Sequence, residues 1–282
     1  MTASSNEITN QLRNVWQEER TAIGAWVLSP DPILAEATAL AGYDWVCIDA
    51  QHGWFGLHDL PALIQAVALA GAAPIVRVPA NETWLIGRAL DAGAFGVMVP
   101  LVNSAQEAAK AVAACRYAPT GGRSVGAFRP APGIATTLRQ ADREVICMVQ
   151  IESKAAVENI EEICAVPGLD AVYIGPGDLY LSLGHQSKSE TDPNILFKIR
   201  DTALRNGVMP GMHGETGEEA RWAVDNGFKH TTTGVDIDFL HREARKALAI
   251  AKGVEESKLG AHSWLNGVPR AAVETGSPDL IR

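Results

Sequence analysis

Short apolar runs alternate with alanine-rich stretches along most of this chain, and this alternation constrains its fold more than any other feature. Eight runs have the length and composition of buried β-strands: Ile23–Leu28, Trp45–Asp49, Pro74–Val78, Gly96–Val99, Val145–Ile151, Ala171–Ile174, Val208–Gly211 and Lys229–Gly234. Amphipathic helical segments between them include Leu57–Ala70, Trp84–Ala92, Ala105–Cys115, Lys154–Val166, Pro193–Asn206 and Glu218–Asn226. Strands that alternate with helices form a parallel sheet, and eight such repeats favour a closed (β/α)8 TIM barrel over an open doubly wound sheet.

The length of 282 residues suits one barrel of about 250 residues with short extensions. We expect an N-terminal helix within residues 1–20, the α/β barrel in 21–253 and a C-terminal tail in 254–282. The helix is expected over Glu7–Glu19. The tail contains Trp264 and Leu265, so we expect it to pack on a neighbouring subunit or the barrel wall, or to be partly disordered.

Loops of two kinds alternate in the predicted barrel. Glycines that end helices mark short loops at its bottom: Gly42, Gly71, Gly93, Gly207 and Gly227. Longer polar loops are expected at the top, over residues 50–56, 116–136, 175–189 and 212–217. In barrel enzymes the top face, at the carboxyl ends of the strands, holds the chemistry.

Charge and cysteine usage exclude several classes of protein. The net charge of −9 and the absence of a basic run disfavour nucleic-acid binding. None of the four cysteines forms a CxxC pair, which favours a reducing compartment without disulfides. The polar N-terminal twenty residues do not have a signal-peptide pattern, and no apolar run is long enough to span a membrane. We therefore expect a cytoplasmic protein.

Two carboxylates follow neighbouring strands of the predicted barrel. Glu152 directly follows the run Val149–Ile151, and Asp178 follows Ile174 after a Gly-Pro-Gly turn. Adjacent strands lie about 4.8 Å apart, so the two side chains can converge on one divalent cation. Oxygen ligands favour a hard ion such as Mg²⁺ or Mn²⁺. The alternative, with equal weight, is that both carboxylates merely stabilise helix N-termini.

Two further strand ends carry candidates for acid–base and charge-stabilising roles. Asp49 ends an apolar run and His52 follows three residues later, a spacing that can form a general-base pair. A strand-end aspartate with an exposed loop histidine is a common alternative. Arg77 can stabilise an enolate oxygen, or balance the charge of Asp49 or Glu152, and the two roles are compatible.

The turn Gly175-Pro176-Gly177 can cradle a carboxylate with its backbone N–H groups, although a plain turn is the more common case. Neither GxGxxG nor GxxxxGK[ST] occurs, so the chain does not have the usual nucleotide-binding patterns. Lys110 and Lys154 lie outside the predicted strands, which disfavours Schiff-base chemistry.

Taken together, these segments resemble the HpcH/HpaI aldolases, class II pyruvate aldolases that include 4-hydroxy-2-oxoheptanedioate and 2-dehydro-3-deoxyglucarate aldolases. The similarity runs from about Gly24 to Lys252. It rests on Gly24–Trp26, Asp49–His52, Val76–Pro79, Leu90–Gly93, Val99–Val102, Arg116–Pro119 with Gly122-Arg123, Gln150–Glu152 and Gly175–Leu179.

The resemblance implies reversible, metal-dependent aldol cleavage of 4-hydroxy-2-oxo acids to pyruvate and an aldehyde. Glu152 and Asp178 would bind Mg²⁺, Mn²⁺ or Co²⁺. Asp49 and His52 would form the base pair, and Arg77 would contact the keto oxygen. The substrate-binding residues would be Trp26, Gln150, Gly175, Gly177 and Asp178. Asp91 would reach a neighbouring subunit's site in a homo-oligomer, a trimer or a hexamer.

The sequence also departs from the family at a few positions. Gln51 replaces the usual glutamate before the histidine, and Ala118 and Ser124 alter the loop that follows Arg116. These changes imply a different pH optimum or acceptor pocket. The alternatives are a related lyase of the citramalate or acyl-CoA type and a non-catalytic barrel, and the combination of Asp49 and His52 favours the aldolase.

Overall fold

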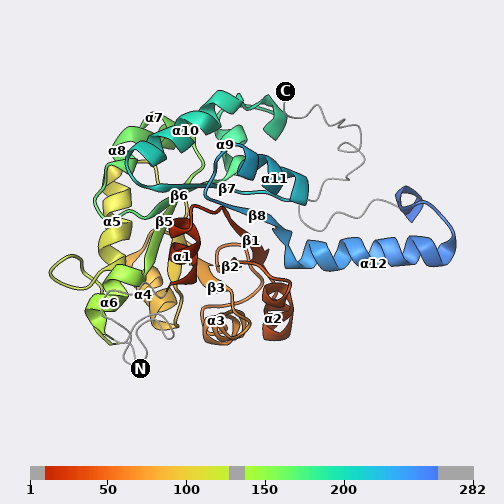
Figure 1. Ribbon diagram of the computed structural model, residues 1–282, viewed down its shortest axis with the longest axis horizontal. Helices are drawn as coiled ribbons and strands as arrows, with labels where there is room; N and C mark the ends of the chain where they lie inside the picture. Colours follow the sequence, from red (N-terminus) through yellow and green to blue (C-terminus); the bar gives the residue numbers. More distant parts are fainter. Residues whose placement is uncertain (1–9, 127–136, 260–282) are drawn as a thin grey trace. The chain divides into compact units, whose positions relative to one another are not determined.

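The computed structural model describes residues 10–126 and 137–259, and its strands close into a parallel barrel. The strands are β1 Ala22–Val27, β2 Trp45–Asp49, β3 Ala73–Arg77, β4 Gly96–Val99, β5 Ile146–Ile151, β6 Ala171–Ile174, β7 Met209–Met212 and β8 His230–Val235. Each pairs with the next along the chain, and β8 pairs with β1. This order confirms the predicted closed barrel, and Figure 1 shows helices lying around the strands.

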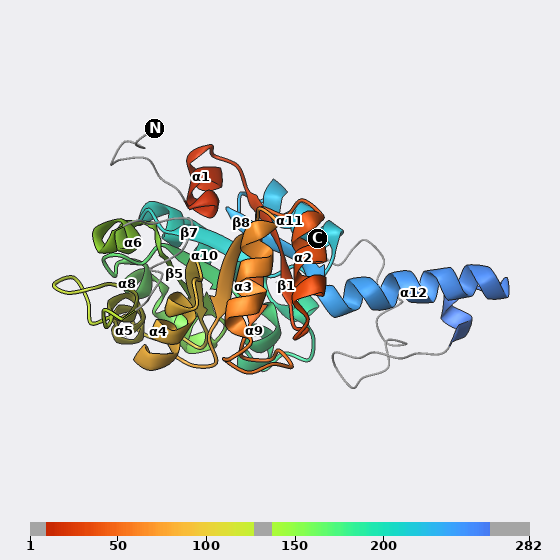
Figure 2. The same ribbon diagram turned by 90° about the horizontal axis from the view of Figure 1, so that it is seen from below.

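The helices follow the predicted alternation with one interruption. Those of the barrel are α2 Pro32–Leu40, α3 Leu60–Leu69, α4 Thr83–Asp91, α5 Ala105–Cys115, α6 Leu138–Glu144, α7 Lys154–Glu158, α8 Ile160–Cys164, α9 Pro176–Ser182, α10 Pro193–Arg205 and α11 Gly217–Asp225, with a 3₁₀ turn η1 at Lys188–Glu190. Figure 2 shows α2 beside α3 and α4 beside α5. The segment expected as one helix from Lys154 is divided into α7 and α8 at Asn159, whose side chain donates to the Asn103 carbonyl at 2.8 Å.

The glycines that were predicted to end helices do so. Gly42, Gly71, Gly93, Gly207 and Gly227 have φ between 70° and 108°, the left-handed conformation that favours glycine. Short loops at these positions return the chain to the start of the next strand. They place the amino ends of the strands together at the bottom of the barrel.

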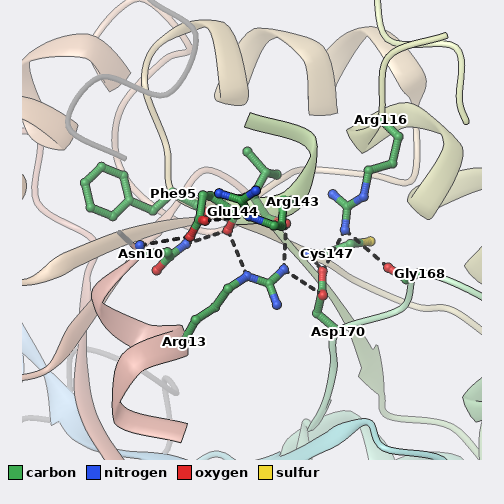
Figure 3. A network of polar contacts seen from close by, with 10 residues as sticks. Asn10, Arg13, Phe95, Arg116, Arg143, Glu144, Cys147, Gly168 and Asp170 are labelled. Carbon is green, nitrogen blue, oxygen red and sulfur yellow. Dashed lines mark hydrogen bonds and ion pairs between the residues drawn. The ribbon is translucent and has the colours of Figure 1, made fainter. Parts of the chain in front are cut away.

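An N-terminal helix, α1 Gln11–Gln17, is attached to this bottom end; it ends at Gln17 instead of Glu19, and the expected start at Glu7 lies outside the described residues. Asn10 accepts from the Leu12 amide and so caps the helix, while its side-chain nitrogen donates to the carbonyls of Phe95 and Glu144. Arg13 donates to Asp170, whose carboxylate also accepts from Arg116 (Figure 3). These partners lie within two residues of the starts of β4, β5 and β6, so polar contacts fix α1 across three strand starts.

The loop after α5 lies at the bottom of the barrel, so its expected position at the top is wrong for the part that the structure describes, 116–126. Arg116 pairs with Asp170 at the start of β6, and Arg123 pairs with Asp91 at the end of α4. The reason is topological: α5 follows β4, so its carboxyl end returns to the strand starts.

The chain divides into two compact units, Met1–Asp236 and Ile237–Arg282. Within the second, the structure describes most of α12 Asp236–Lys252 and a 3₁₀ turn, η2 Glu256–Leu259. Trp264 and Leu265 lie outside the described residues, and the bounds proposed for the barrel and the tail stay predictions. Across the described ranges, no helix is both long and apolar enough for a membrane span.

Candidate active site

A buried ion pair joins the carboxyl ends of β2 and β3. Asp49 and Arg77 are register partners in these strands. Arg77 donates from Nε and Nη2 to the two carboxylate oxygens of Asp49, at 2.8 and 2.5 Å, and the Asp49 side chain is 1% exposed. Burial opposes the charge of Arg77, but the bonds and charge of Asp49 prevail and raise the pKa of Arg77 above its ordinary value. The guanidinium is therefore a fixed cation at the top of the barrel.

The carboxylate of Asp49 also holds the loop that carries His52. The backbone amides of Gln51 and His52 donate to Asp49 Oδ1 at 3.1 and 3.2 Å. The His52 side chain is exposed and makes no hydrogen bond to the Asp49 carboxylate within the described ranges. Asp49 thus orients Arg77 and the loop backbone, and the side-chain pair of Asp49 with His52 stays a prediction.

Two other predicted site residues contact the Arg77 guanidinium. Its central carbon lies 4.4 Å from the centroid of the Trp26 ring, in cation–π geometry. Its Nη1 donates to Gln150 Oε1 at 3.5 Å, a long hydrogen bond. Trp26 and Gln150 are both buried. Strands β1, β3 and β5 thus bring these three side chains together.

Glu152, directly after β5, is a buried carboxylate without a protein counter-ion. It is 3% exposed, and its Oε1 accepts from the Leu101 amide at 2.7 Å. Among the described residues, no lysine or arginine lies within ion-pair distance of its oxygens. Burial, with a further contribution from the charge of nearby Asp178, raises the pKa of Glu152. A cation bound beside this carboxylate would offset the unfavourable burial of its negative charge.

The two glycines of the Gly-Pro-Gly turn after β6 differ in what an added side chain would contact. A Cβ on Gly175 would lie 2.5 Å from Glu152 Oε2, so only glycine leaves the carboxylate where it is. A Cβ on Gly177 would meet nothing within 4 Å. Gly175 is therefore required by Glu152, whereas a requirement for glycine at 177 would have to come from a bound ligand.

The donor set fits a hard divalent cation. In the described part of the chain, no group of three or more His, Cys, Asp and Glu side chains gathers in metal-binding geometry. The available ligands are Glu152, buried beside Gly175, and Asp178, which is exposed. Two carboxylates, with the remaining positions left to water and substrate, are typical of Mg²⁺ sites.

Asp91 lies at the other end of its own barrel. It ends α4, and its carboxylate accepts from Arg123 at 2.9 Å. Arg123 in turn lies over the Tyr117 ring. Asp91 is therefore not brought together with Arg77 or Glu152 within one chain, and its role at a neighbouring subunit's site stays a prediction.

Sequence reasoning missed a polar cluster next to Trp26. His213 follows β7, and its Nδ1 lies 3.4 Å from the Tyr173 hydroxyl and 3.3 Å from the Thr232 hydroxyl. Thr232 also accepts from the Trp26 indole nitrogen at 3.3 Å. The signal available was a histidine directly after an apolar strand, the same kind of position that singled out Asp49 and Glu152.

Comparisons with known proteins identify the family. The family model for HpcH/HpaI aldolase/citrate lyase matches residues 22–237. The chain is 37% identical to 2-dehydro-3,6-dideoxy-6-sulfogluconate aldolase of Pseudomonas putida, covering 84% of this chain and 95% of that protein. It is 36% identical to hydroxypyruvate/pyruvate aldolase of Rhizorhabdus wittichii, covering 87% and 100% respectively.

The fold is also similar to solved structures. An HpcH/HpaI aldolase/citrate lyase family protein from Burkholderia cenocepacia superposes with a TM-score of 0.81 at 34% identity, covering 86% of this chain and all of that one. The family model, over residues 22–237, spans all eight strands of the barrel. The chain therefore belongs to the HpcH/HpaI aldolase/citrate lyase family.

Proposed function

We propose that this protein is a class II pyruvate aldolase, a carbon–carbon lyase that reversibly cleaves 4-hydroxy-2-oxo acids to pyruvate and an aldehyde. The observation that carries the proposal is the buried Glu152, which forms no ion pair within residues 10–126 and 137–259 and lies close to both Asp178 and the fixed cation of Arg77. The names of the similar aldolases support it. Acids of this class pair a carboxylate with a keto group, and the site offers cationic and N–H partners for both.

Glu152 and Asp178 would hold the divalent cation, Mg²⁺, Mn²⁺ or Co²⁺. When bound, such an ion supplies Lewis-acid stabilisation of the negative oxygen that develops during cleavage. The hydrogen bond from Arg77 to the Gln150 side chain is long, at 3.5 Å. The Gln150 amide can therefore exchange it for a hydrogen bond to a substrate bound beside Arg77.

The residues of the chain divide the remaining work. The backbone N–H groups of Gly177 and Asp178, in the turn that begins at Gly175, bind the substrate carboxylate, and Arg77 donates to the keto oxygen. His52 accepts the proton of the 4-hydroxyl, after which the C3–C4 bond breaks and the aldehyde leaves. The electron pair of that bond forms the pyruvate enolate, whose oxygen Arg77 stabilises, and protonation at C3 gives pyruvate. Addition is the reverse.

We further propose that the protein is a homo-oligomer in which Asp91 approaches a neighbouring barrel. The outer helices carry exposed apolar side chains that one barrel does not cover: Ile33 (75% exposed) and Leu40 (66%) on α2, and Leu69 (87%) on α3. Such a face is typical of subunit contacts. The cluster of Asp91, Arg123 and Tyr117 at the bottom of the barrel is then available to a second subunit.

The test is metal removal combined with an adduct trap. Exhaustive treatment with EDTA should abolish pyruvate release from a 4-hydroxy-2-oxo acid, measured with lactate dehydrogenase, and Mg²⁺, Mn²⁺ or Co²⁺ should restore it. Full activity after chelation, with a borohydride-trapped pyruvate adduct on a lysine, would replace the proposal by Schiff-base chemistry.

A further inference from the structure

Leu101, at the top of the barrel just after β4, has an uncommon backbone conformation for a leucine. Its φ is 55°, in the left-handed region, where the Cβ of any residue but glycine crowds the backbone. The side chain does not account for this conformation, because it is 54% exposed. Conformations of this kind persist where surrounding contacts impose them, often at functional sites. What the conformation achieves is therefore to be sought in the backbone of Leu101.

The left-handed turn directs the Leu101 amide at the proposed metal ligand. Its N–H donates to Glu152 Oε1 at 2.7 Å, a charge-assisted hydrogen bond. Glu152 Oε2 makes no hydrogen bond to any residue that the structure describes, and it is not among the enclosed unpartnered atoms. This oxygen lies beside the turn that leads to Asp178, since a Cβ on Gly175 would be 2.5 Å from it. One oxygen of Glu152 is thus occupied and the other is open.

Asn103 holds the loop that carries Leu101. Its side-chain nitrogen donates to the Leu101 carbonyl at 2.9 Å, and its backbone amide donates to Glu107 Oε2 at 2.6 Å. Its side-chain oxygen accepts from the hydroxyl of Ser153, the residue directly after Glu152. The loop after β4 is therefore tied to the segment after β5 on both sides of the Leu101 amide, which keeps this amide on Glu152.

We infer that the Leu101 amide, held in place by Asn103, is a positioning group that restricts Glu152 to one-oxygen coordination, so that the site selects Mg²⁺ against Ca²⁺. This assignment rests on the proposed function. Mg²⁺ requires near-octahedral oxygen ligands at about 2.0–2.1 Å, whereas Ca²⁺ takes about six to eight at about 2.3–2.6 Å and accepts both oxygens of a carboxylate. A carboxylate with one oxygen bound to an N–H offers a single ligand in a fixed direction. This suits the smaller ion and withholds a ligand that the larger ion would use.

Replacement of the Leu101 N–H by an ester oxygen tests the inference most directly. The α-hydroxy analogue of leucine, incorporated at position 101 by nonsense suppression, removes this donor and keeps the side chain. Leu101→Gly is the complementary control, because it keeps the N–H and glycine adopts a φ of 55° without strain.

Asn103→Ala is a second route that leaves residue 101 unchanged, because it removes only the side-chain support of the loop. Asn81→Ala is its matched control. The Asn81 side chain donates to the Glu107 carbonyl at 2.9 Å, near the same end of α5, and forms no hydrogen bond with Leu101. Thermal melting without added metal should show that each variant is folded.

The measurement is metal binding itself. The electron paramagnetic resonance signal of free Mn²⁺ gives the Kd for Mn²⁺, and competition against Mn²⁺ gives the values for Mg²⁺ and Ca²⁺. The ester variant should bind Mn²⁺ and Mg²⁺ about 10- to 100-fold more weakly, as is typical when a partner of a metal ligand is lost, and Ca²⁺ within about 3-fold of the wild type. Asn103→Ala should shift the preference in the same direction. Leu101→Gly and Asn81→Ala should keep the wild-type preference.

The possible failures are distinguishable. An equal fall in affinity for Mg²⁺ and Ca²⁺ in the ester variant, or an unchanged preference in it, would overturn the role of Leu101 and leave the proposed function standing. If the ester variant does not fold, an unchanged preference in Asn103→Ala would overturn the role equally. Failure of the wild-type protein to bind Mn²⁺ would overturn the proposed metal site at Glu152 and this assignment with it.

Discussion

Gly175→Ala should weaken activation of this enzyme by divalent cations without unfolding it. The backbone at Gly175 has φ −94° and ψ 90°, which alanine can adopt, so the substitution acts through space. The added Cβ would lie 2.5 Å from Glu152 Oε2 and 3.0 Å from Glu152 Cβ. The carboxylate would have to move by at least about 0.5 Å to restore a tolerable contact.

The size of the effect follows from that displacement. Mg²⁺ requires oxygen ligands at about 2.0–2.1 Å in near-octahedral geometry, so a shift of this size removes Glu152 from a proper ligand position. Overpacking of this kind costs about 1–3 kcal/mol. If that cost falls on the bound state, the activation constant for Mg²⁺ rises by roughly 5- to 150-fold.

The assay is the rate of pyruvate release as a function of free Mg²⁺, fitted for the activation constant. Gly217→Ala is the matched control, because Gly217 also begins a helix at the top of the barrel and a Cβ there meets nothing within 4 Å. Gly177→Ala gives a second comparison: it should raise the KM for the 2-oxo acid and leave the activation constant for Mg²⁺ unchanged. A wild-type activation constant in Gly175→Ala would refute the placement of the cation at Glu152.

Two further predictions concern the proposed base and the buried histidine of β8. His52→Ala should lower the rate of aldol cleavage by about 10²–10⁴-fold but keep most oxaloacetate decarboxylation, because decarboxylation needs no hydroxyl deprotonation. Arg77→Ala should lose both reactions. Equal losses of the two reactions in His52→Ala would remove the role of His52 as base. Burial lowers the pKa of His230 to about 3, below its ordinary value. As the pH falls, the unfolded chain therefore binds the proton before the folded protein does. The free energy of unfolding should then decrease from about pH 6.5 downward. Urea unfolding should show that His230→Phe removes about 2 kcal/mol of the stability loss between pH 7.5 and 5, and an identical pH dependence in both proteins would contradict this reasoning.

The barrel was predictable because its strands are buried on both faces. Runs such as Val46–Ile48 and Val172–Ile174 are fully enclosed, so they read as continuous apolar segments, and the glycines between helices and strands mark the returns. The loop at 116–126 was misplaced because top and bottom loops of a barrel share the same polar, proline- and glycine-containing composition. Its place directly after a helix assigns it to the bottom, and its contacts with Asp91 and Asp170 agree.

The sequence indicated which polar residues lie at the ends of the strands but not how they pair. Asp49 and Arg77 each end a strand, yet the sequence did not indicate that Arg77 would occupy both carboxylate oxygens and leave His52 with only a backbone bond. Tyr173 and Thr232 resemble ordinary strand residues, so their shared contact with His213 is visible only once β6, β7 and β8 are neighbours. Which strand positions face one another depends on barrel register, and no local pattern encodes it.

The attachment of α1 to the bottom of the barrel has a consequence for synthesis of the protein. Two contacts of α1 involve residues that are synthesised much later. Arg13 pairs with Asp170, and the Trp16 indole donates to the carbonyl of Lys229. At ribosomal rates of about 5–20 residues per second, more than 200 residues of delay correspond to roughly 10–40 s. Throughout that interval the contacts that hold the helix carrying Leu12, Val15 and Trp16 are incomplete. The first helix of the chain can therefore complete its native contacts only after the start of β8 has been synthesised.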